Sequence, residues 1–229
     1  PCSVVPWTEL EQLYREGKYV PYDDEALKEL LISVKKQVQP WIRLNRIIRD
    51  IPVAYIQGGC QRQHMRQELQ MQFRGLSICA CIRCREVKGG RFARDGIKLM
   101  VRKYPASDGF EHFISFESTD EKTLYGFLRL RTTDKYLETF PVLRDCALIR
   151  ELHVYGKVLQ TNGNGNKNKM AVAATQHQGL GRALLDKAAE IAIHEGYTKI
   201  AVISGVGVRS YYKRFGYKLC DTYMIRSLI

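Results

Sequence analysis

The chain has 229 residues, of which 45% are hydrophobic and 26% charged; this is enough apolar material for a core and argues against disorder. No apolar run reaches ~18 residues and no signal-peptide pattern opens the sequence, so we expect no membrane span and no membrane partner. Seven cysteines without such a signal indicate a reduced protein, which we place in the cytoplasm. Because the first residue is Pro1 rather than methionine, we expect a piece of a longer protein.

The basic charge is concentrated in one segment. The net charge is +12, and residues 41–104 hold 14 lysines and arginines against four acids, a net charge of +10. Such a block indicates a polyanionic partner, although a solvated basic face would give the same pattern.

In the first half of the chain the patterns predict helices joined by short irregular segments. Acids open the second helix and lysines close it, as the helix dipole favours, and Pro40 ends it. Apolar periodicity predicts helices at 8–19, 23–38 and 64–75 and a strand at 41–48. After Gly90 the sequence changes from helical patterns to a mixture of strand and helix patterns, so we place a domain boundary near 85–90.

The second half mixes the patterns of strands and helices. A Gly/Asn/Lys-rich loop at 160–169 interrupts them, and we expect it to be flexible. Alternation and apolar runs predict strands at 97–104, 109–118, 123–133, 147–156 and 199–205, a helix at 179–195, and a short helix within 208–217 that leads into a last strand. The fold class is therefore α/β (α+β).

Two glycines stand at the start of the predicted helix, in the stretch from Gln176 to Arg182. Gly179 and Gly181 allow the backbone to approach a ligand closely, and the free N–H groups of a helix start favour an anion such as a pyrophosphate. The stretch is not a Walker loop, because no Gly-Lys-Ser/Thr follows, and it lacks the third glycine of a dinucleotide fingerprint. A tight turn is the alternative reading of the glycines alone.

The order of these features resembles the GNAT family of acetyl-CoA-dependent N-acetyltransferases: a strand, the Gln176-x-x-Gly179-x-Gly181 loop, a helix, a strand and "YYKRFGY". The resemblance spans roughly 91–229 and implies a mixed central sheet. In that family the loop holds the cofactor pyrophosphate, the preceding strand lends its main chain to the pantetheine arm, and a tyrosine lies near the thiol. The acetyl-CoA residues that it implies here are Glu151, Leu152, His153, Val154, Gln176, Gln178, Gly179, Leu180, Gly181, Arg182 and Tyr212.

Longer motifs resemble the family of the Elongator catalytic subunit over essentially the whole chain. They are "YREGKYVPYDDEAL", "WIRLNRIIRDIP", "MRQEL", "CIRCREV", "RELHVYG", "QHQGLG" and "KIAVISGVGVRSYYKRFGY". The resemblance implies a remnant of a radical-SAM domain at 1–59, a basic zinc-binding linker at 60–90 and the acetyltransferase domain at 91–229. The family's C-x-x-x-C-x-x-C motif is missing, so an iron–sulfur cluster and S-adenosylmethionine are expected only in an absent N-terminal half.

This second resemblance implies a reaction. Acetyl-CoA donates the acetyl group that starts carboxymethyl-type modification at C5 of the tRNA wobble uridine, and the basic block holds the anticodon stem-loop. Other Elongator subunits are implied as partners. Two alternatives stay open: a protein (histone) lysine N-acetyltransferase, which the basic charge disfavours because histone tails are basic too, and a non-catalytic module that binds tRNA and acetyl-CoA.

Three cysteines stand close together as Cys79-x-Cys81-x-x-Cys84, a spacing that favours a zinc site over three separate reduced thiols. The sequence does not identify the fourth ligand. His64 and Cys60 are nearest in sequence, and we favour His64.

Acetyl transfer from a thioester needs a proton donor for the leaving thiolate and a base for a protonated nucleophile. A phenol suits the first role, and the family position selects Tyr212 for it; the alternative is a packed aromatic ring. Glu151 and His153 alternate with apolar residues on one strand face, so either could be the base or a structural strand residue. His177 lies in the loop, where it could contact phosphate or solvent.

Overall fold

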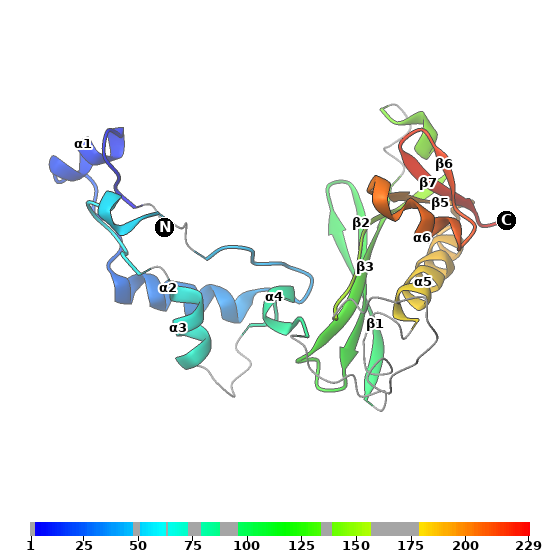
Figure 1. The fold of residues 1–229 in the computed structure, drawn as a ribbon, viewed down its shortest axis with the longest axis horizontal. Helices are drawn as coiled ribbons and strands as arrows, with labels where there is room; N and C mark the ends of the chain where they lie inside the picture. The colour runs from blue at the N-terminus through cyan, green and yellow to red at the C-terminus, as the bar shows by residue number, and fades with distance from the viewer. Residues whose placement is uncertain are drawn as a thin grey trace, which may run out of the picture. The chain divides into compact units, whose positions relative to one another are not determined.

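The computed structural model describes residues 3–47, 51–62, 64–72, 79–87, 96–133, 139–156 and 179–229, with the side chains of Gln70 and Gln72 left undescribed. They form two compact units, Pro1–Arg85 and Glu86–Ile229, each with its own apolar core (Figure 1). No helix in the described ranges has the length and apolar character needed to cross a membrane.

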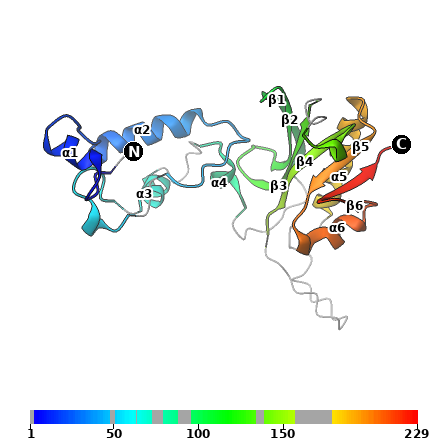
Figure 2. The same cartoon turned by 90° about the horizontal axis from the view of Figure 1, so that it is seen from above.

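The first unit is helical. Its elements are α1 (Glu9–Arg15), α2 (Asp24–Gln37), the 3-10 turn η1 (Val53–Tyr55), α3 (Met65–Gln72) and α4 (Ile82–Arg85). Thr8 and Asp23 cap α1 and α2 by accepting hydrogen bonds from backbone N–H groups of the first turn. The helices α2 and α3 lie side by side (Figures 1 and 2), and Leu27, Met65 and Leu69 form the fully buried core between them.

The predicted strand at 41–48 is wrong for the residues that the structure describes. Residues 41–47 form an irregular segment. Arg66 Nη2 donates hydrogen bonds to the carbonyl oxygens of Leu44 (2.8 Å) and Asn45 (3.2 Å), so a side chain rather than a neighbouring strand satisfies these groups. Ile47 packs against the core of the unit. The segment therefore follows the helices instead of entering a sheet.

The second unit is built on one seven-stranded mixed sheet, which confirms the predicted fold class. Its elements are β1 (Ile97–Ala106), β2 (Gly109–Ser118), β3 (Leu124–Thr132), η2 (Pro141–Leu143), β4 (Cys146–Val154), α5 (Leu180–His194), β5 (Lys199–Ile203), η5 (Val206–Val208), α6 (Arg209–Lys213), β6 (Lys218–Cys220) and β7 (Tyr223–Ser227). The spatial order is β1-β2-β3-β4-β5-β7-β6; β4 and β5 are parallel and every other neighbouring pair is antiparallel. The single last strand of the prediction is a hairpin of two strands.

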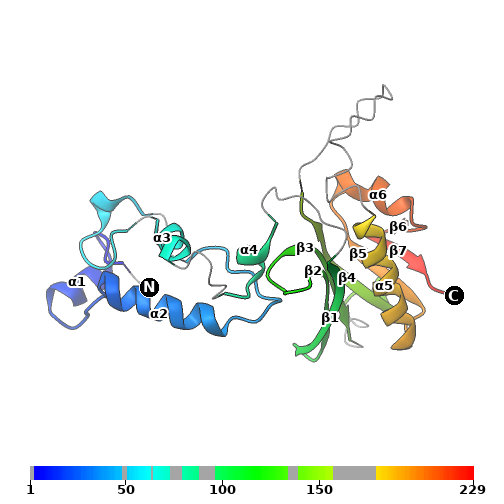
Figure 3. The same ribbon diagram turned by 90° about the horizontal axis from the view of Figure 1, so that it is seen from below.

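The helix α5 covers one face of this sheet, as Figures 1 and 3 show. Its apolar stripe, which includes Leu184, Ala188 and Ala192, packs against Ile114 and Leu128 of the sheet. The crossover from β4 through α5 to β5 is what makes these two strands parallel. The predicted loop at 160–169 lies outside the described residues.

A bulge in β4 decides which side chains face α5. Arg129 pairs with Glu151 and the next residue of β3, Leu130, pairs with Ile149, so Arg150 is an extra residue on β4. Because the bulge shifts the alternation by one, Leu152 joins Ile149 on the α5 face. Side chains that would otherwise point into the core are turned to the opposite face.

Candidate active site and cysteine cluster

The parallel strands β4 and β5 are hydrogen-bonded over only part of their length. Their ladder pairs Cys146–Ile149 with Lys199–Val202. Beyond it, β4 continues to Val154 with β3 as its one strand neighbour in the described chain, while β5 stays paired with β7. The edge of 150–154 that faces away from β3 is therefore not taken up by a described strand. An extended ligand can hydrogen-bond along such an edge as an added strand does.

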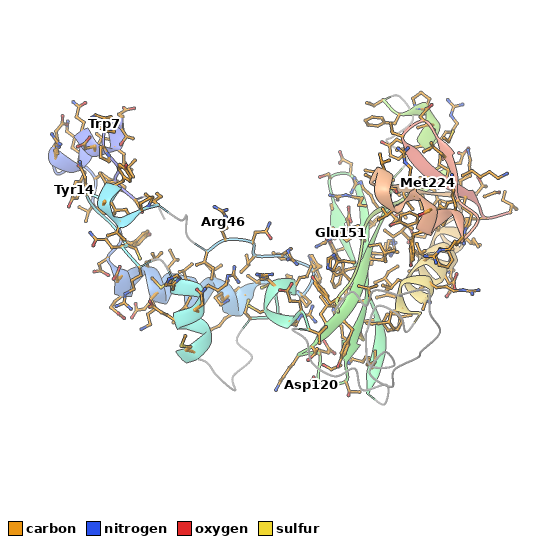
Figure 4. The ribbon with its side chains drawn as sticks, in the orientation of Figure 1. Trp7, Tyr14, Arg46, Asp120, Glu151 and Met224 are labelled. Carbon is orange, nitrogen blue, oxygen red and sulfur yellow. The ribbon has the colours of Figure 1, made fainter. Side chains whose placement is uncertain are left out.

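Glu151 and His153 share the face of β4 opposite α5, as their alternation predicts. Glu151 Oε2 accepts a hydrogen bond from Arg129 Nε at 3.0 Å. The ring of His153 stacks on Phe127, with centroids 6.2 Å apart, and lies 4.4 Å from the ring of Tyr155. Both side chains are exposed, and Figure 4 shows Glu151 on the side of the sheet away from α5.

Arg129 holds the Glu151 carboxylate from a largely buried position. Its guanidinium lies over the rings of Phe113 (5.4 Å) and Phe127 (5.6 Å), and its Nη1 donates to Tyr104 Oη at 3.0 Å. These contacts leave the arginine little freedom, so Glu151 is offered to solvent in a fixed orientation.

Two glycines shape the start of α5 in different ways. Gly179 caps the helix with φ +79°, a left-handed conformation that favours glycine, and a Cβ there would meet nothing within 4 Å. A Cβ on Gly181 would lie 2.3 Å from Tyr211 Oη and 3.8 Å from Val154 Cγ2. The first turn of α5 thus lies beside both the end of β4 and α6, and its backbone is open at Gly179.

The other predicted loop residues are less informative. Leu180 is buried in the core, and the side chain of Arg182 is exposed, 3.5 Å from Asp186. Gln176, His177 and Gln178 lie outside the described residues.

The tyrosines of α6 occupy different surroundings. Tyr212 is 7% exposed and meets Tyr217 and Tyr211 edge-on, with centroids 5.8 and 5.3 Å apart. Burial raises the pKa of Tyr212 to about 12, and the nearby Tyr211 adds to the rise. Tyr212 is therefore neutral at ordinary pH and keeps its proton for donation. Tyr211 is half-buried, and its hydroxyl lies at the first turn of α5.

The three cysteines of the predicted metal site are gathered in the first unit. The sulfur atoms of Cys79, Cys81 and Cys84 lie within 4.8 Å of one another, and the first two residues are buried. Hydrogen bonds with Cys79 and Cys81 lower the pKa of Cys84. The Lys35 ammonium donates to Cys84 Sγ at 3.4 Å from a position that is 5% exposed, and it lowers that pKa further.

This cluster fits a zinc ion in chemistry and size. Tetrahedral thiolates with Zn–S bonds of ~2.3 Å place their sulfurs ~3.8 Å apart, which agrees with the observed gathering. The buried lysine supplies positive charge that partly balances three thiolates. In the described part of the chain His64 is exposed and does not belong to the cluster, and Cys60 packs against the core of the helical unit instead.

Sequence reasoning missed three residues of these sites. Lys35 looked like one of the lysines that close a helix, and nothing in the sequence links it to a cysteine 49 positions away. Arg129 is recognisable only once the register of β3 on β4 is known. Tyr211 stood beside Tyr212 in the motif, and only the contact with Gly181 distinguishes their positions.

Two known families match different parts of the chain. Residues 1–74 match the radical-SAM C-terminal domain, and residues 98–217 match the acetyltransferase (GNAT) family. The second match covers more than half of the chain and includes β4, α5 and α6.

Curated relatives and a solved structure match the chain along its length. It is 39% identical to the tRNA uridine(34) acetyltransferase of Dehalococcoides mccartyi over 242 residues, which covers all of this chain and 50% of that protein. It is 36% identical to human Elongator complex protein 3 over 234 residues, again all of this chain and 42% of that protein. The structure of Methanocaldococcus infernus Elp3 with an N-terminal deletion superposes with a TM-score of 0.82 at 35% identity, covering 99% of this chain and 54% of that one.

The chain thus spans about half the length of the relatives that it matches. The similarity to them extends over both matched regions of this chain. The chain therefore belongs to the acetyltransferase (GNAT) family, and it corresponds to the C-terminal portion of Elongator complex protein 3 and of the tRNA uridine(34) acetyltransferases.

Proposed function

We propose that this chain is the acetyl-CoA-dependent acetyltransferase portion of an enzyme that modifies C5 of the wobble uridine of tRNA, in the carboxymethyl type of modification. The observation that carries the proposal is the glycine-started helix α5, which lies at the end of β4 where β4 and β5 part. We infer the tRNA acceptor from relatives that are named tRNA uridine(34) acetyltransferases. Chemistry that needs an iron–sulfur cluster and S-adenosylmethionine is assigned to the part of those relatives that this chain does not span.

The residues around α5 fit the parts of acetyl-CoA. When bound, the cofactor supplies an acetyl group activated as a thioester. The first-turn N–H groups of α5, from Gly179 to Arg182, would hold the pyrophosphate, since helix starts favour anions and Gly179 leaves the backbone accessible. The main chain of residues 151–154 would hold the pantetheine arm along its unshared edge. Gln176 and Gln178 complete the proposed loop.

The proposed chemistry places a proton donor and a carboxylate on opposite faces of the sheet. Tyr212 holds a proton on its phenolic oxygen and gives it to the leaving sulfur, which suits a group kept neutral by burial. Glu151, oriented by Arg129, is the proposed proton acceptor on the acceptor side, with His153 beside it as the second candidate.

We also propose that Cys79, Cys81 and Cys84 hold a structural zinc ion. The ion would fix the short helix α4 to α2 through the cysteines and Lys35. His64, the proposed fourth ligand, would have to approach the cluster from its exposed position. The domain limits of 1–59, 60–90 and 91–229 belong to the same proposal.

The proposed partners are the anticodon stem-loop of tRNA and other Elongator subunits, met in the cytoplasm. Both are inferred from the names of the relatives and from the basic charge of the chain.

The test is the release of CoA from acetyl-CoA by the purified chain, followed with a thiol reagent, with and without an unmodified anticodon stem-loop. We expect release that the RNA accelerates and that Tyr212→Phe reduces at unchanged acetyl-CoA affinity. Acetyl-CoA binding without any release, with or without RNA, would indicate a binding module instead. Acceleration by a lysine peptide and not by RNA would favour a protein acetyltransferase.

A further inference from the structure

In the described part of the basic segment 41–104, much of the positive charge is engaged within the chain. In the described part of this segment, most basic side chains already have carboxylate or carbonyl partners. Arg62, for example, binds both Asp24 (2.9 Å) and Glu68 (2.8 Å). The others are Arg66 with Leu44 and Asn45, Arg85 with Ala80 and Pro40, Lys98 with Glu121, Arg102 with Glu117 and Glu121, and Lys103 with Glu195. These cations are held by the fold and are poor candidates for an external polyanion.

The helix α6 carries two basic side chains whose surroundings differ from these. Arg209 and Lys213 are four residues apart and so lie on the same side of the helix. Neither has an ion-pair partner among the residues described in the two units. Arg209 Nε is moreover buried without a hydrogen-bond partner. A buried N–H of a charged group that lacks an acceptor is unfavourable, so this guanidinium is suited to a ligand that brings one.

Exposed apolar side chains stand immediately before these cations. Ile203 ends β5, and Val206 and Val208 lie in η5; they are 57%, 76% and 51% exposed. Together with Arg209 and Lys213 they form what we call the 203–213 surface. Aliphatic groups next to unpaired cations complement a ligand that combines flat apolar faces with negative charge, and unpaired nucleotides combine both.

The position of the 203–213 surface connects it to the acetyl-transfer site. It begins at the end of β5 that lies past the last β4–β5 pair, where the two strands have parted. Tyr212 lies between its two cations in the sequence of α6, and its side chain is buried whereas that of Lys213 is exposed. Nucleotides held by Arg209 and Lys213 would therefore lie over the outer side of the helix that carries Tyr212.

We propose that the 203–213 surface binds the unpaired nucleotides of the RNA acceptor, with the bases on Ile203, Val206 and Val208 and the phosphates on Arg209 and Lys213. This inference rests on the proposed function, and it moves the RNA-binding surface from the basic 41–104 segment to the acetyltransferase unit. Charge complementarity and the unsatisfied Arg209 favour it over a solvated surface.

The experiment compares the full chain with two variants of equal charge. The test variant is Arg209→Gln with Lys213→Gln. The control is Lys122→Gln with Arg144→Gln, two exposed residues in the connections that precede β3 and β4. Fluorescence anisotropy measures the binding of an unmodified anticodon stem-loop and of a fully paired RNA of equal length over a series of salt concentrations, and calorimetry measures acetyl-CoA affinity. A third variant, Val206→Asp, tests the apolar part of the surface.

We expect the test variant to bind the stem-loop roughly 10-fold or more weakly at about 50 mM salt, with a salt slope smaller by about 1.5 units. The control should stay close to the wild-type affinity, and acetyl-CoA affinity should not change. Val206→Asp should reduce binding of the stem-loop more than binding of the paired RNA.

Three results would overturn the assignment. The first is equal RNA binding by the test variant and the wild type, and the second is an equal loss of RNA affinity in the control variant. The third is a loss of acetyl-CoA affinity alone, which would indicate that the surface binds the nucleotide half of the cofactor instead. A failure of the proposed function looks different, because the wild-type chain itself would then neither bind the stem-loop nor release CoA faster in its presence.

Discussion

Replacing Gly181 by alanine tests the packing at the proposed cofactor site. The added Cβ would lie 2.3 Å from Tyr211 Oη, far inside van der Waals contact, and 3.5 Å from Tyr211 Cζ, which is an ordinary contact. The hydroxyl is thus the one atom that must move. Tyr211 is held by Arg214, whose guanidinium lies 5.2 Å from its ring centroid, and by the ring of Phe215 at 5.1 Å.

The expected effect follows from two opposed contributions. Overpacking of this kind destabilises a protein by about 1–3 kcal/mol, whereas alanine is favoured over glycine in a helix by about 1 kcal/mol. Gly181→Ala alone should therefore lower the free energy of unfolding by roughly 0–2 kcal/mol. In a Tyr211→Phe background the clash disappears, and the same change should be neutral or stabilise by up to about 1 kcal/mol. The two substitutions should be coupled by roughly 1–3 kcal/mol.

The assay is denaturant unfolding of the wild type, both single variants and the double variant, with melting temperature as a second reading. For a unit of this size 1 kcal/mol corresponds to a shift of about 2–4 °C. Gly179→Ala is the matched control: it meets no atom within 4 Å but forces a side chain to φ +79°, so its cost of about 1–2 kcal/mol should not depend on Tyr211. If Gly181→Ala costs the same with and without the Tyr211 hydroxyl, the reasoning is refuted.

Three further predictions concern other parts of the chain. Tyr212→Phe should slow CoA release by about 100-fold or more at unchanged acetyl-CoA affinity, and because the pKa of Tyr212 is raised to about 12, an activity loss centred near neutral pH cannot come from this group. Protein purified under reducing, chelator-free conditions should contain roughly one zinc per chain, and Cys81→Ser should lose the metal and raise hydrogen exchange in the helical unit more than in the sheet unit; metal analysis that finds no stoichiometric zinc would contradict the site. Burial lowers the pKa of His112 below 6.5, so below that pH the unfolded chain takes up a proton that the folded chain resists. Stability should fall as the pH drops from 6.5, and His112→Gln should make the unfolding midpoint less dependent on pH; an unchanged pH dependence would remove His112 as its source.

The local sequence patterns located those strands and helices that bury one face against a core. The strands β2 and β3 and the helix α5 lie close to where alternation and helical periodicity put them, because each buries one face against the same core. The segment 41–48 has strand-like composition too, but a strand also needs a neighbour, and no local pattern reports one. There the side chain of Arg66 takes the carbonyls of Leu44 and Asn45 instead.

Contacts between distant positions could not be predicted in the same way. The pairing of Arg129 with Glu151 depends on a register set by one extra residue in β4, and the approach of Lys35 to Cys84 depends on how α2 packs. A count of charges likewise overlooked that Arg62 is already paired. The sequence therefore showed which residues can carry chemistry, but it did not show which residues they contact.

The extra residue in β4 separates the length of this strand from the direction in which its side chains point. Arg150 stands opposite no residue of β3, so a strand without it would pair Ile149 and Glu151 with consecutive residues of β3, as now, and keep the same register. Leu152 and Val154 would stay on the α5 face, and Glu151 and His153 would stay on the opposite face. The deletion would remove the ion pair of Arg150 with Glu111, a carboxylate that is 2% exposed. Loss of one residue at this point would therefore change the bend of β4 while leaving its inside and outside as they are, whereas the same change elsewhere in the strand would turn over every side chain that follows.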